Sequence, residues 1–322
     1  MGKLNMLAQR QPQPGPRPDA WRDDVAVVIP CYNEAATIAK VVADFVRALP
    51  GARIIVVDNA SSDGTGALAE AAGAFVVRES RRGKGFALLH GFRAARGASY
   101  VVMVDGDDTY PAEDAVKLIA AVESGADVAI GTRLADYESG AFRSTHTLGN
   151  KLFIGLIRAM FGVKTQDLFS GYRAFTHRFL EASPLIAQGF EVETELSIQA
   201  LCGGYLVTEI PVRYRARPVE SPSKLNTFRD GYRILIALLA FFRDYRPLML
   251  FTSIALAFLV GALATGSVVV TEYLRTGQVL RMPTAVLSVG LVLLSAVSTI
   301  GGLLLSSINR RSAELAALIS RR

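Results

Sequence analysis

Short apolar runs alternate with helical patterns from residue 25 onward. The strand-like runs are VAVVIP, RIIVVD, AFVVRE, YVVMVD and DVAIGT, at 25–30, 53–58, 74–79, 100–105 and 127–132. Helical stretches near 35–48, 64–72, 85–96 and 112–124 separate them. Continuous apolar strands separated by helices are typical of a mostly parallel sheet covered on both faces. The pattern predicts an α/β domain, in which ligands bind outside the carboxyl ends of the strands.

The pattern changes after residue 145. A helical stretch near 147–161 is followed by TQDLFSGYRAF, by the helical EVETELSIQALCGG and by the strand-like YLVTEIPVRYRAR. Farther on, one helical face carries apolar residues at spacings of four and three, namely Phe228, Tyr232, Leu235, Leu239 and Phe242. Arginines border that face, so we expect an amphipathic helix on the membrane surface at 226–246. A core helix of the preceding domain is the alternative.

Two long segments near the C-terminus, 248–271 and 282–309, contain no charged residue. As helices, both would exceed the hydrocarbon thickness that about 20 residues span. The chain of 322 residues is also 51% hydrophobic, with a mean hydropathy of +0.31. Two membrane spans are therefore expected, although buried core helices are the alternative. The expected organisation is a Pro-rich tail (1–24), an α/β domain (25–225), the amphipathic helix, a membrane hairpin (247–309) and a basic tail (310–322).

Basic residues flank the outer ends of both spans. Arg243 and Arg246 precede the first span, and Arg310, Arg311, Arg321 and Arg322 follow the second. Basic flanks favour the cytosolic side, so the α/β domain is expected in the cytosol, on the inner (plasma) membrane. Two distant cysteines, Cys31 and Cys202, suggest no disulfide framework and fit that compartment.

Three carboxylates follow the fourth strand-like run, in the sequence VVMVDGDDTYP. Clustered carboxylates near a core are costly unless they bind or pair with something, so acid–base catalysis, metal binding and loop capping are all open. Asp108 could cap the next helix, whereas Asp105 and Asp107 could both face one cation. Oxygen ligands without nearby Cys or His favour Mg²⁺ or Mn²⁺.

Five segments in order carry a family resemblance: VVIPCYNEAATI, IIVVDNASSDGTG, RRGKGFALLHGF, VDGDDTYP and QDLFSGYRAF. Together they resemble the family 2 glycosyltransferases, which have a GT-A-type nucleotide-diphosphosugar-binding fold. The run RARPVESPSKLNTFRDGYRIL and the two spans are similar to the polyprenyl-phosphate branch, which includes dolichyl-phosphate mannose synthases. The resemblance covers roughly residues 25 to 243.

The resemblance implies a donor site at the strand ends. It assigns nucleotide-sugar binding to Pro30, Tyr32, Asn33, Glu34, Asp58, Lys84, Asp105 and Gly106. Asp105 and Asp107 would hold Mg²⁺ or Mn²⁺ against the diphosphate, and Asp107 would thereby be catalytic. Some relatives carry a Gln two residues after the second Asp, where this chain has Thr109. A turn role for Asp58 and a solvated Lys84 are the structural alternatives.

The acceptor implied by the resemblance is a polyprenyl phosphate, which needs cationic positioning. Its phosphate is assigned to Arg133, Ser170, Arg173, Arg217 and Lys224. Attraction to anionic lipid headgroups is the alternative for the basic cluster at 213–233, which includes Arg217 and Lys224, and bracing of the SGYRAF turn is the alternative for Arg173. Asp167 is the candidate general base or sugar-orienting carboxylate, and a structural cap is its alternative.

The expected function is inverting transfer of one hexose from UDP- or GDP-hexose to a polyprenyl phosphate at the cytosolic membrane face. Transfer to another membrane lipid, and a non-catalytic scaffold that binds nucleotide sugar, are the alternatives. The expected partners are the nucleotide sugar, the lipid acceptor and the bilayer. No nucleic-acid partner is expected, and self-association is left open. The only tryptophan, Trp21, precedes the domain, which disfavours processive synthases with a Q-x-x-R-W sequence.

Overall fold

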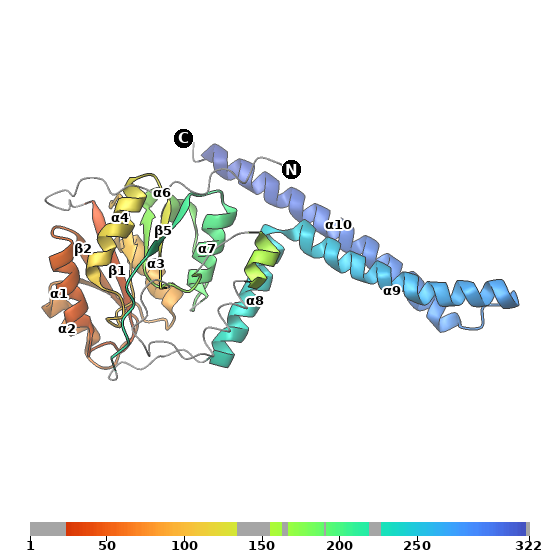
Figure 1. The fold of residues 1–322 in the computed structure, drawn as a ribbon, viewed down its shortest axis with the longest axis horizontal. Helices are drawn as coiled ribbons and strands as arrows, with labels where there is room; N and C mark the ends of the chain where they lie inside the picture. The colour runs from red at the N-terminus through yellow and green to blue at the C-terminus, as the bar shows by residue number, and fades with distance from the viewer. Residues whose placement is uncertain (1–23, 134–154, 163–166, 190, 219–226, 320–322) are drawn as a thin grey trace. The chain divides into compact units, whose positions relative to one another are not determined.

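A computed structural model describes residues 24–133, 155–162, 167–189, 191–218 and 227–319. It divides into two compact units, Met1–Ala237 and Leu238–Arg322. The first unit contains the α/β domain, and the second contains the long C-terminal helices (Figure 1).

The α/β domain is built on a seven-stranded sheet in the order β3-β2-β1-β4-β6-β5-β7. The strands are β1 (Val25–Cys31), β2 (Arg53–Asp58), β3 (Phe75–Arg78), β4 (Tyr100–Met103), β5 (Val128–Thr132), β6 (Arg173–Thr176) and β7 (Val207–Pro211). All adjacent pairs are parallel except those that involve β6, which runs antiparallel to both β4 and β5. The mostly parallel sheet predicted from the apolar runs is confirmed.

Helices cover both faces of the sheet. One core contains side chains of α1 (Ile38–Ala48), α2 (Thr65–Ala71) and α4 (Ala115–Glu123), which follows a short 3₁₀ turn, η1 (Ala112–Asp114). The other contains side chains of α3 (Lys84–Ala94), α6 (His177–Ala182) and α7 (Val192–Cys202). Along β1, Val25, Val27 and Ile29 face the first core, whereas Ala26 and Val28 face the second. Burial on both faces explains why the strand sequences are continuously apolar.

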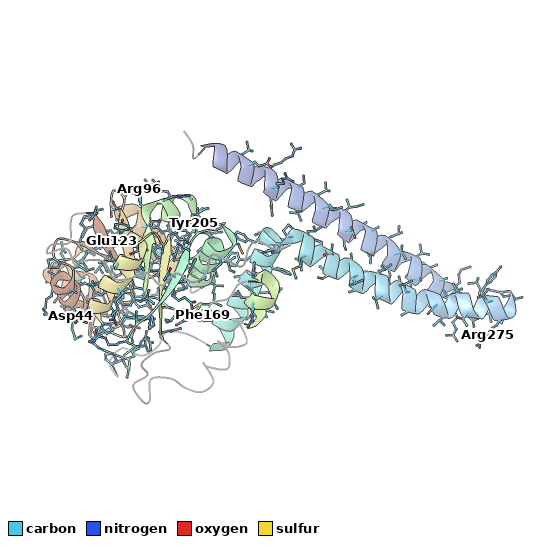
Figure 2. All side chains as sticks on the ribbon, turned by 45° about the horizontal axis from the view of Figure 1, so that its top comes forward. Asp44, Arg96, Glu123, Phe169, Tyr205 and Arg275 are labelled. Carbon is cyan, nitrogen blue, oxygen red and sulfur yellow. The ribbon has the colours of Figure 1, made fainter. Side chains whose placement is uncertain are left out.

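The C-terminal helices are α8 (Thr227–Tyr245), α9 (Pro247–Thr276) and α10 (Met282–Ile319). The apolar stretches Pro247–Thr276 and Met282–Ser312 have mean hydropathies of 2.2 and 2.1, and only 11% and 6% of their most apolar windows are buried. Both helices are therefore long and apolar enough to cross a membrane, and they are not buried as core helices of a soluble domain would be. Figure 2 shows side chains projecting outward along both of them, with Arg275 near the end of α9.

The two long helices pack against each other through small residues. Ala255, Ala262 and Val269 of α9 are buried and recur every seven residues. Ser288 Oγ donates to the carbonyl oxygen of Ala262 (3.0 Å), and Ser295 Oγ donates to that of Ala255 (2.8 Å). Small side chains allow this close approach, and the serine hydroxyls find hydrogen-bond acceptors across the interface, as is common between membrane helices.

Helix α8 matches the predicted amphipathic helix in extent. Of the predicted apolar face, Tyr232, Leu235 and Leu239 are exposed, whereas Phe242 is buried, as is its neighbour Leu238. An exposed apolar stripe on this helix fits a position at a membrane surface.

Candidate active site

The carboxyl ends of β1 and β2 carry two loops that are tied together. Cys31 is paired with Asp58 in the sheet register. Asn33 N donates to Ser61 Oγ (3.0 Å), and its Oδ1 accepts from Ser62 N (2.8 Å). Glu34 N donates to Thr65 Oγ1 (2.9 Å). The predicted convergence of Pro30, Tyr32, Asn33 and Glu34 with Asp58 at one edge is therefore observed.

Asp58 combines a turn role with a position at this edge. Its Oδ1 accepts from Ser61 N (3.0 Å), which is the turn contact expected of the alternative. A side chain at Gly66 would place its Cβ 2.7 Å from Asp58 Oδ2, so glycine allows α2 to begin against this carboxylate. The fractional burial of Asp58 is intermediate, so part of the side chain still faces the solvent side of the edge.

Asparagine and glycine shape the loop that leads to Lys84. Asn59 Nδ2 donates to the carbonyl oxygens of Glu79 (3.2 Å) and Arg81 (2.6 Å), and Asn59 Oδ1 accepts from Gly83 N (2.8 Å). Gly83 has φ = 146°, and a Cβ there would lie 2.1 Å from the carbonyl oxygen of Gln188. Only glycine fits this approach, and α3 begins immediately afterwards with Lys84.

Lys84 is largely covered rather than solvated, with 11% of its side chain exposed. Its Nζ contacts Asp105 and also lies 2.5 Å from Glu193 Oε1, on α7. Burial opposes the charged form, but the two carboxylates outweigh it and raise the pKa of Lys84. The alternative of an exposed lysine is thus wrong, although contact with a diphosphate stays a prediction.

The loop after β4 presents its carboxylates in different ways. Asp105 keeps 27% of its side chain exposed beside Lys84. Asp107 is nearly buried, accepts from Thr109 Oγ1 (2.6 Å) and pairs with Arg217. Gly106 lies between them, where a Cβ would come within 2.6 Å of Cys31 Sγ. Thr109, at the position where some relatives have Gln, therefore orients Asp107.

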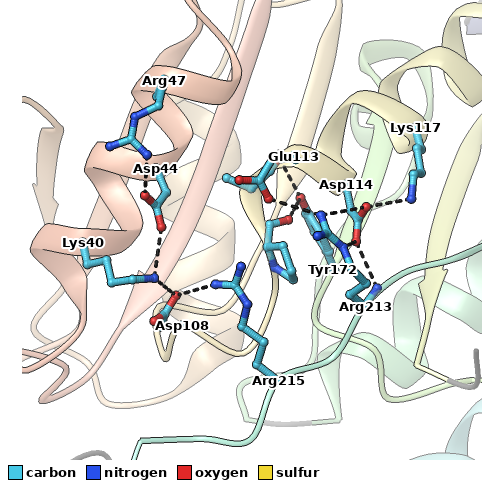
Figure 3. Close-up of polar contacts among 12 residues, drawn as sticks. Lys40, Asp44, Arg47, Asp108, Glu113, Asp114, Lys117, Tyr172, Arg213 and Arg215 are labelled. Carbon is cyan, nitrogen blue, oxygen red and sulfur yellow. Dashed lines mark hydrogen bonds and ion pairs between the residues drawn. The ribbon is translucent and has the colours of Figure 1, made fainter. Parts of the chain in front are cut away.

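Asp108 does not cap the next helix. It has φ = 60°, and its Oδ1 lies 2.6 Å from Lys40 Nζ and 3.6 Å from an Arg215 guanidinium nitrogen (Figure 3). The residue before η1 is Pro111, and no side chain caps that turn. The capping prediction is wrong because a basic residue on α1 and another after β7 hold this carboxylate instead.

Every second residue after β7 pairs with an acid of the loop and turn after β4. Arg213 donates to Asp114 (Nε to Oδ2, 3.2 Å), Arg215 lies beside Asp108, and Arg217 pairs with Asp107. The period of two follows from the extended backbone of the sequence RYRAR, which also donates from Arg215 N to the carbonyl oxygen of Thr109 (2.9 Å). This pairing brings Arg217 to the edge that carries Asp105 and Asp107.

The two aspartates are chemically suited to a hard divalent ion. They provide oxygen ligands only, on one short loop, and the described residues contain no group of three His, Cys, Asp or Glu side chains that could hold a metal. Mg²⁺ and Mn²⁺ in such sites take their remaining ligands from water and substrate phosphates. Asp105 and Asp107 thus fit an ion that binds together with a diphosphate, and this assignment stays a prediction.

Asp167 and Arg133 form a bidentate pair. Arg133 Nε lies 2.7 Å from Asp167 Oδ2, and Arg133 Nη2 lies 2.7 Å from Oδ1. Asp167 also accepts from Phe169 N (3.1 Å) and is almost fully buried. The pair orients both groups, and the remaining exposed part of Arg133 is the part that could meet an anion.

Ser170 and Arg173 lie inside the domain. The Arg173 guanidinium donates to the carbonyl oxygens of Ser170 (2.9 Å) and Leu168 (2.7 Å) and to Ser197 Oγ (2.8 Å), and its exposure is 0%. These are the contacts of a residue that braces the turn, which was the alternative to phosphate binding. Lys224 lies outside the described residues.

Several buried polar residues of the site region were not predicted. Glu195 accepts from Ile186 N (3.0 Å) and Ala187 N (2.8 Å), which holds the segment that packs on Gly83 and Gly85. Glu193, on the same helix, holds Lys84. The one available signal was the acidic run EVETE at the start of an otherwise apolar helix, where α7 is buried through most of its length.

Comparisons with known proteins identify relatives of the chain. Residues 26–183 match the Glycosyl transferase family 2 model. The chain is 38% identical over 242 residues to Glycosyltransferase AglJ of Haloferax volcanii, covering 75% of this chain and 78% of that protein. It is 34% identical over 206 residues to the polyprenol monophosphomannose synthase of Mycolicibacterium smegmatis, covering 59% of this chain and 77% of that one.

A solved structure has the same fold. The crystal structure of glucosyl-3-phosphoglycerate synthase from Mycobacterium tuberculosis in complex with Mn²⁺, UDP and glucosyl-3-phosphoglycerate superposes with a TM-score of 0.56. The match covers 68% of this chain and 80% of that chain at 24% sequence identity. At this level of sequence identity, the structural similarity shows a shared fold alone.

Proposed function

The chain belongs to glycosyltransferase family 2, in its polyprenyl-phosphate branch, and we propose that it transfers one hexose from a nucleotide sugar to a polyprenyl phosphate. The observation that carries this proposal is the group of charged side chains at one edge of the sheet. There, Asp105 and Asp107 meet Lys84 and Arg217, which come from separate segments of the chain. Two carboxylates for a metal and two cations for phosphates are what a metal–diphosphate and a lipid phosphate require.

The donor would lie across the ends of β1, β2 and β4. Asn33, Glu34 and Asp58 would receive the nucleoside, because their loops are fixed to each other at that edge. A divalent ion held by Asp105 and Asp107 would neutralise charge on the departing nucleoside diphosphate. Lys84 would add a positive charge at the same phosphates. Mg²⁺ and Mn²⁺ both suit these ligands.

The acceptor phosphate is already an anion, so its activation needs little base catalysis and mainly correct positioning. Arg217 and the exposed part of Arg133 would hold it for attack on the anomeric carbon. The carbon–oxygen bond to the nucleoside diphosphate breaks as the new bond to the lipid phosphate forms, and a single displacement inverts the configuration. Asp167 would orient Arg133 through their bidentate pair.

Transfer is proposed at the cytosolic face of the inner membrane. The two helices that could cross a membrane, α9 and α10, and the basic residues at their outer ends support this location. Nucleotide sugars are made in the cytosol, so a domain on that side would have direct access to the donor.

Membranes that contain the full chain test the proposal when they are incubated with radiolabelled UDP-glucose, UDP-galactose or GDP-mannose. We expect label in a lipid that releases the sugar on mild acid treatment, as a glycosyl phosphodiester does, and more label when polyprenyl phosphate is added. Membranes with Asp107→Asn are the control and should incorporate almost none. Label in an acid-stable lipid, in an amount that does not rise when polyprenyl phosphate is added, would contradict the acceptor assignment.

A further inference from the structure

Each carboxylate proposed for the divalent ion is already paired with a basic side chain of the chain itself. Lys84 pairs with Asp105, and Arg217 pairs with Asp107. A cation that enters this site must therefore replace an internal one. The arrangement around Lys84 shows where the displaced charge can go.

Lys84 lies between two carboxylates in a nearly closed environment. The exposed fractions of the side chains are 11% for Lys84, 27% for Asp105 and 5% for Glu193. A lysine ammonium has three N–H donors, so it can serve both carboxylates together. Charges at this distance are strongly coupled, because little water separates them.

Glu193 has one oxygen to spare. Its Oε1 lies 2.5 Å from Lys84 Nζ, whereas its buried Oε2 has no hydrogen-bond partner among the residues that the structure describes. A buried carboxylate oxygen without a donor is costly. A small movement of Lys84 away from Asp105 would give this oxygen a donor, and Asp105 would then be free for a metal ion.

We propose that Lys84 is an internal counter-ion of the metal site and that Glu193 is the positioning residue that receives it. Lys84 keeps Asp105 neutralised until a diphosphate arrives. The diphosphate then offers Lys84 new acceptors, Glu193 retains it beside them, and Asp105 turns to the divalent ion. Metal and diphosphate therefore bind cooperatively, and the site has low affinity for the metal alone. This inference rests on the proposed donor site.

The predicted coupling follows from charge. Replacing Lys84 by neutral glutamine removes a positive charge beside Asp105, so Mn²⁺ alone should bind more tightly, by roughly tenfold at this separation. Replacing Glu193 by glutamine has the opposite effect, because Lys84 is then left to Asp105 alone. Mn²⁺ alone should bind about tenfold more weakly to Glu193→Gln. UDP or GDP without metal should bind that variant as tightly as, or more tightly than, the wild type.

Free Mn²⁺ in solutions of the detergent-purified full chain is measured by electron paramagnetic resonance, with and without UDP or GDP. The wild type should bind Mn²⁺ at least about tenfold more tightly when the nucleotide is present, and Lys84→Gln should lose most of this enhancement. Lys117→Gln is the matched control, since Lys117 is a lysine paired with Asp114 outside the site, and it should behave as the wild type. A thermal melt accompanies each variant.

The outcomes separate the two proposals. If wild-type protein binds Mn²⁺ with UDP or GDP but Lys84→Gln binds Mn²⁺ alone no more tightly, the counter-ion role is wrong and the donor site stands. If Glu193→Gln weakens metal and nucleotide together and lowers the melting temperature, Glu193 merely supports the fold, which also overturns the inference. If the wild type binds neither nucleotide with Mn²⁺, the proposed donor site itself fails, and the inference fails with it.

Discussion

Single residues at the site are distinguished mainly by their partners. Asp105, Asp107 and Asp108 are neighbours in sequence, yet each meets a different basic residue, drawn from α3, from the segment after β7 or from α1. A carboxylate that is nearly buried needs such a partner, because an unpaired buried charge is costly. The roles of the three aspartates therefore differ in ways that substitution can resolve.

Asp107→Asn should nearly abolish transfer while the protein stays folded. Asparagine keeps the size of the side chain and can still meet Thr109, but it removes the charge proposed for the metal and leaves Arg217 without its carboxylate. Turnover at saturating Mg²⁺ or Mn²⁺ and a thermal melt measure the two effects. Asp108→Asn is the control, since its partners Lys40 and Arg215 lie toward the surface. Unchanged wild-type turnover in a chelator would refute the metal requirement.

Substitution of Arg173 and of Arg217 tests which arginine supports the fold and which binds the acceptor phosphate. Arg173→Ala would leave two buried carbonyl oxygens and Ser197 without their hydrogen-bond donor, each at a cost of about 1–3 kcal/mol. The melting temperature should therefore fall, and use of the nucleotide sugar and of the lipid acceptor should decline together. Arg217→Ala leaves nearly buried Asp107 without its partner, but 30% of the Arg217 side chain is exposed, so the melting temperature should fall less than in Arg173→Ala. Acceptor use should fall by roughly ten- to a hundredfold for a lost charge-assisted phosphate contact.

Calorimetry with the nucleotide sugar and kinetics with polyprenyl phosphate distinguish these variants. Selective loss of acceptor use in Arg173→Ala, with an unchanged melt, would restore the phosphate-binding role first assigned to Arg173 from the sequence.

A buried acid beside the Lys84 loop makes a contribution to stability that depends on pH. Glu79 accepts from Arg81 (Nη2 to Oε2, 2.8 Å), and this contact, against the effect of burial, lowers the pKa of Glu79 from 4.5 to about 2. A lowered pKa in the folded state stabilises the protein above the unfolded value, and the gain disappears as pH falls toward the folded value. Between pH 4.5 and pH 3, the melting temperature of the wild type should fall more than that of Glu79→Gln. Parallel curves for the two proteins would contradict this contribution.

At the scale of elements, strands β1 to β5 were predicted to within two residues at each end because each is a continuous apolar run. Strand β6 was missed. Three of its four residues lie in the SGYRAF segment and Thr176 follows it, and they form a strand only because β4 and β5 offer edges on either side. Such pairing depends on the rest of the fold, and local sequence does not reveal it.

The same limit applies to the site. Chain order predicted which strand ends converge, because parallel strands share one edge. The partners of Lys84 could not be predicted, since Glu193 comes from a helix more than a hundred residues away in the chain. Asp63 was likewise missed. Its carboxylate accepts from Ala35 N (3.0 Å) and Thr65 Oγ1 (2.5 Å), and so links the loop after β1 to the loop after β2. The local sequence, DNASSDGTG, indicates only a turn.

The hairpin of α9 and α10 allows a prediction about packing. Ala262→Leu should force the helices apart, because Ala262 is 2% exposed and its carbonyl oxygen accepts from Ser288 across the interface. Overpacking of this kind costs about 1–3 kcal/mol. Ala264→Leu, at an exposed position of the same helix, is the matched control. A lower melting temperature in detergent is expected for Ala262→Leu only, and equal melts would show that the interface tolerates separation.

For the whole molecule, the decisive question is which side of the membrane holds the α/β domain. Glu272 and Arg275 lie at the end of α9, and Arg281 lies in the connection to α10, with its Nε 3.5 Å from Glu272 Oε1. One of the two basic charges there is thus partly compensated, whereas basic residues lie at the outer ends of both helices. The balance of basic residues favours the domain on the cytosolic side and the connection on the opposite side.

Single cysteines test this topology in a Cys202→Ser background, in which the remaining native cysteine, Cys31, is buried. A membrane-impermeant thiol reagent added to intact cells should label Thr276→Cys, which lies at the end of α9, and should not label Ser139→Cys, which lies in the α/β part of the sequence outside the described residues. After permeabilisation both should react, which shows that each thiol is accessible. Labelling of Ser139→Cys alone in sealed cells would reverse the orientation. The domain would then have no access to cytosolic nucleotide sugars, and the donor would have to come from outside, so the proposed reaction and the observed topology could not both hold.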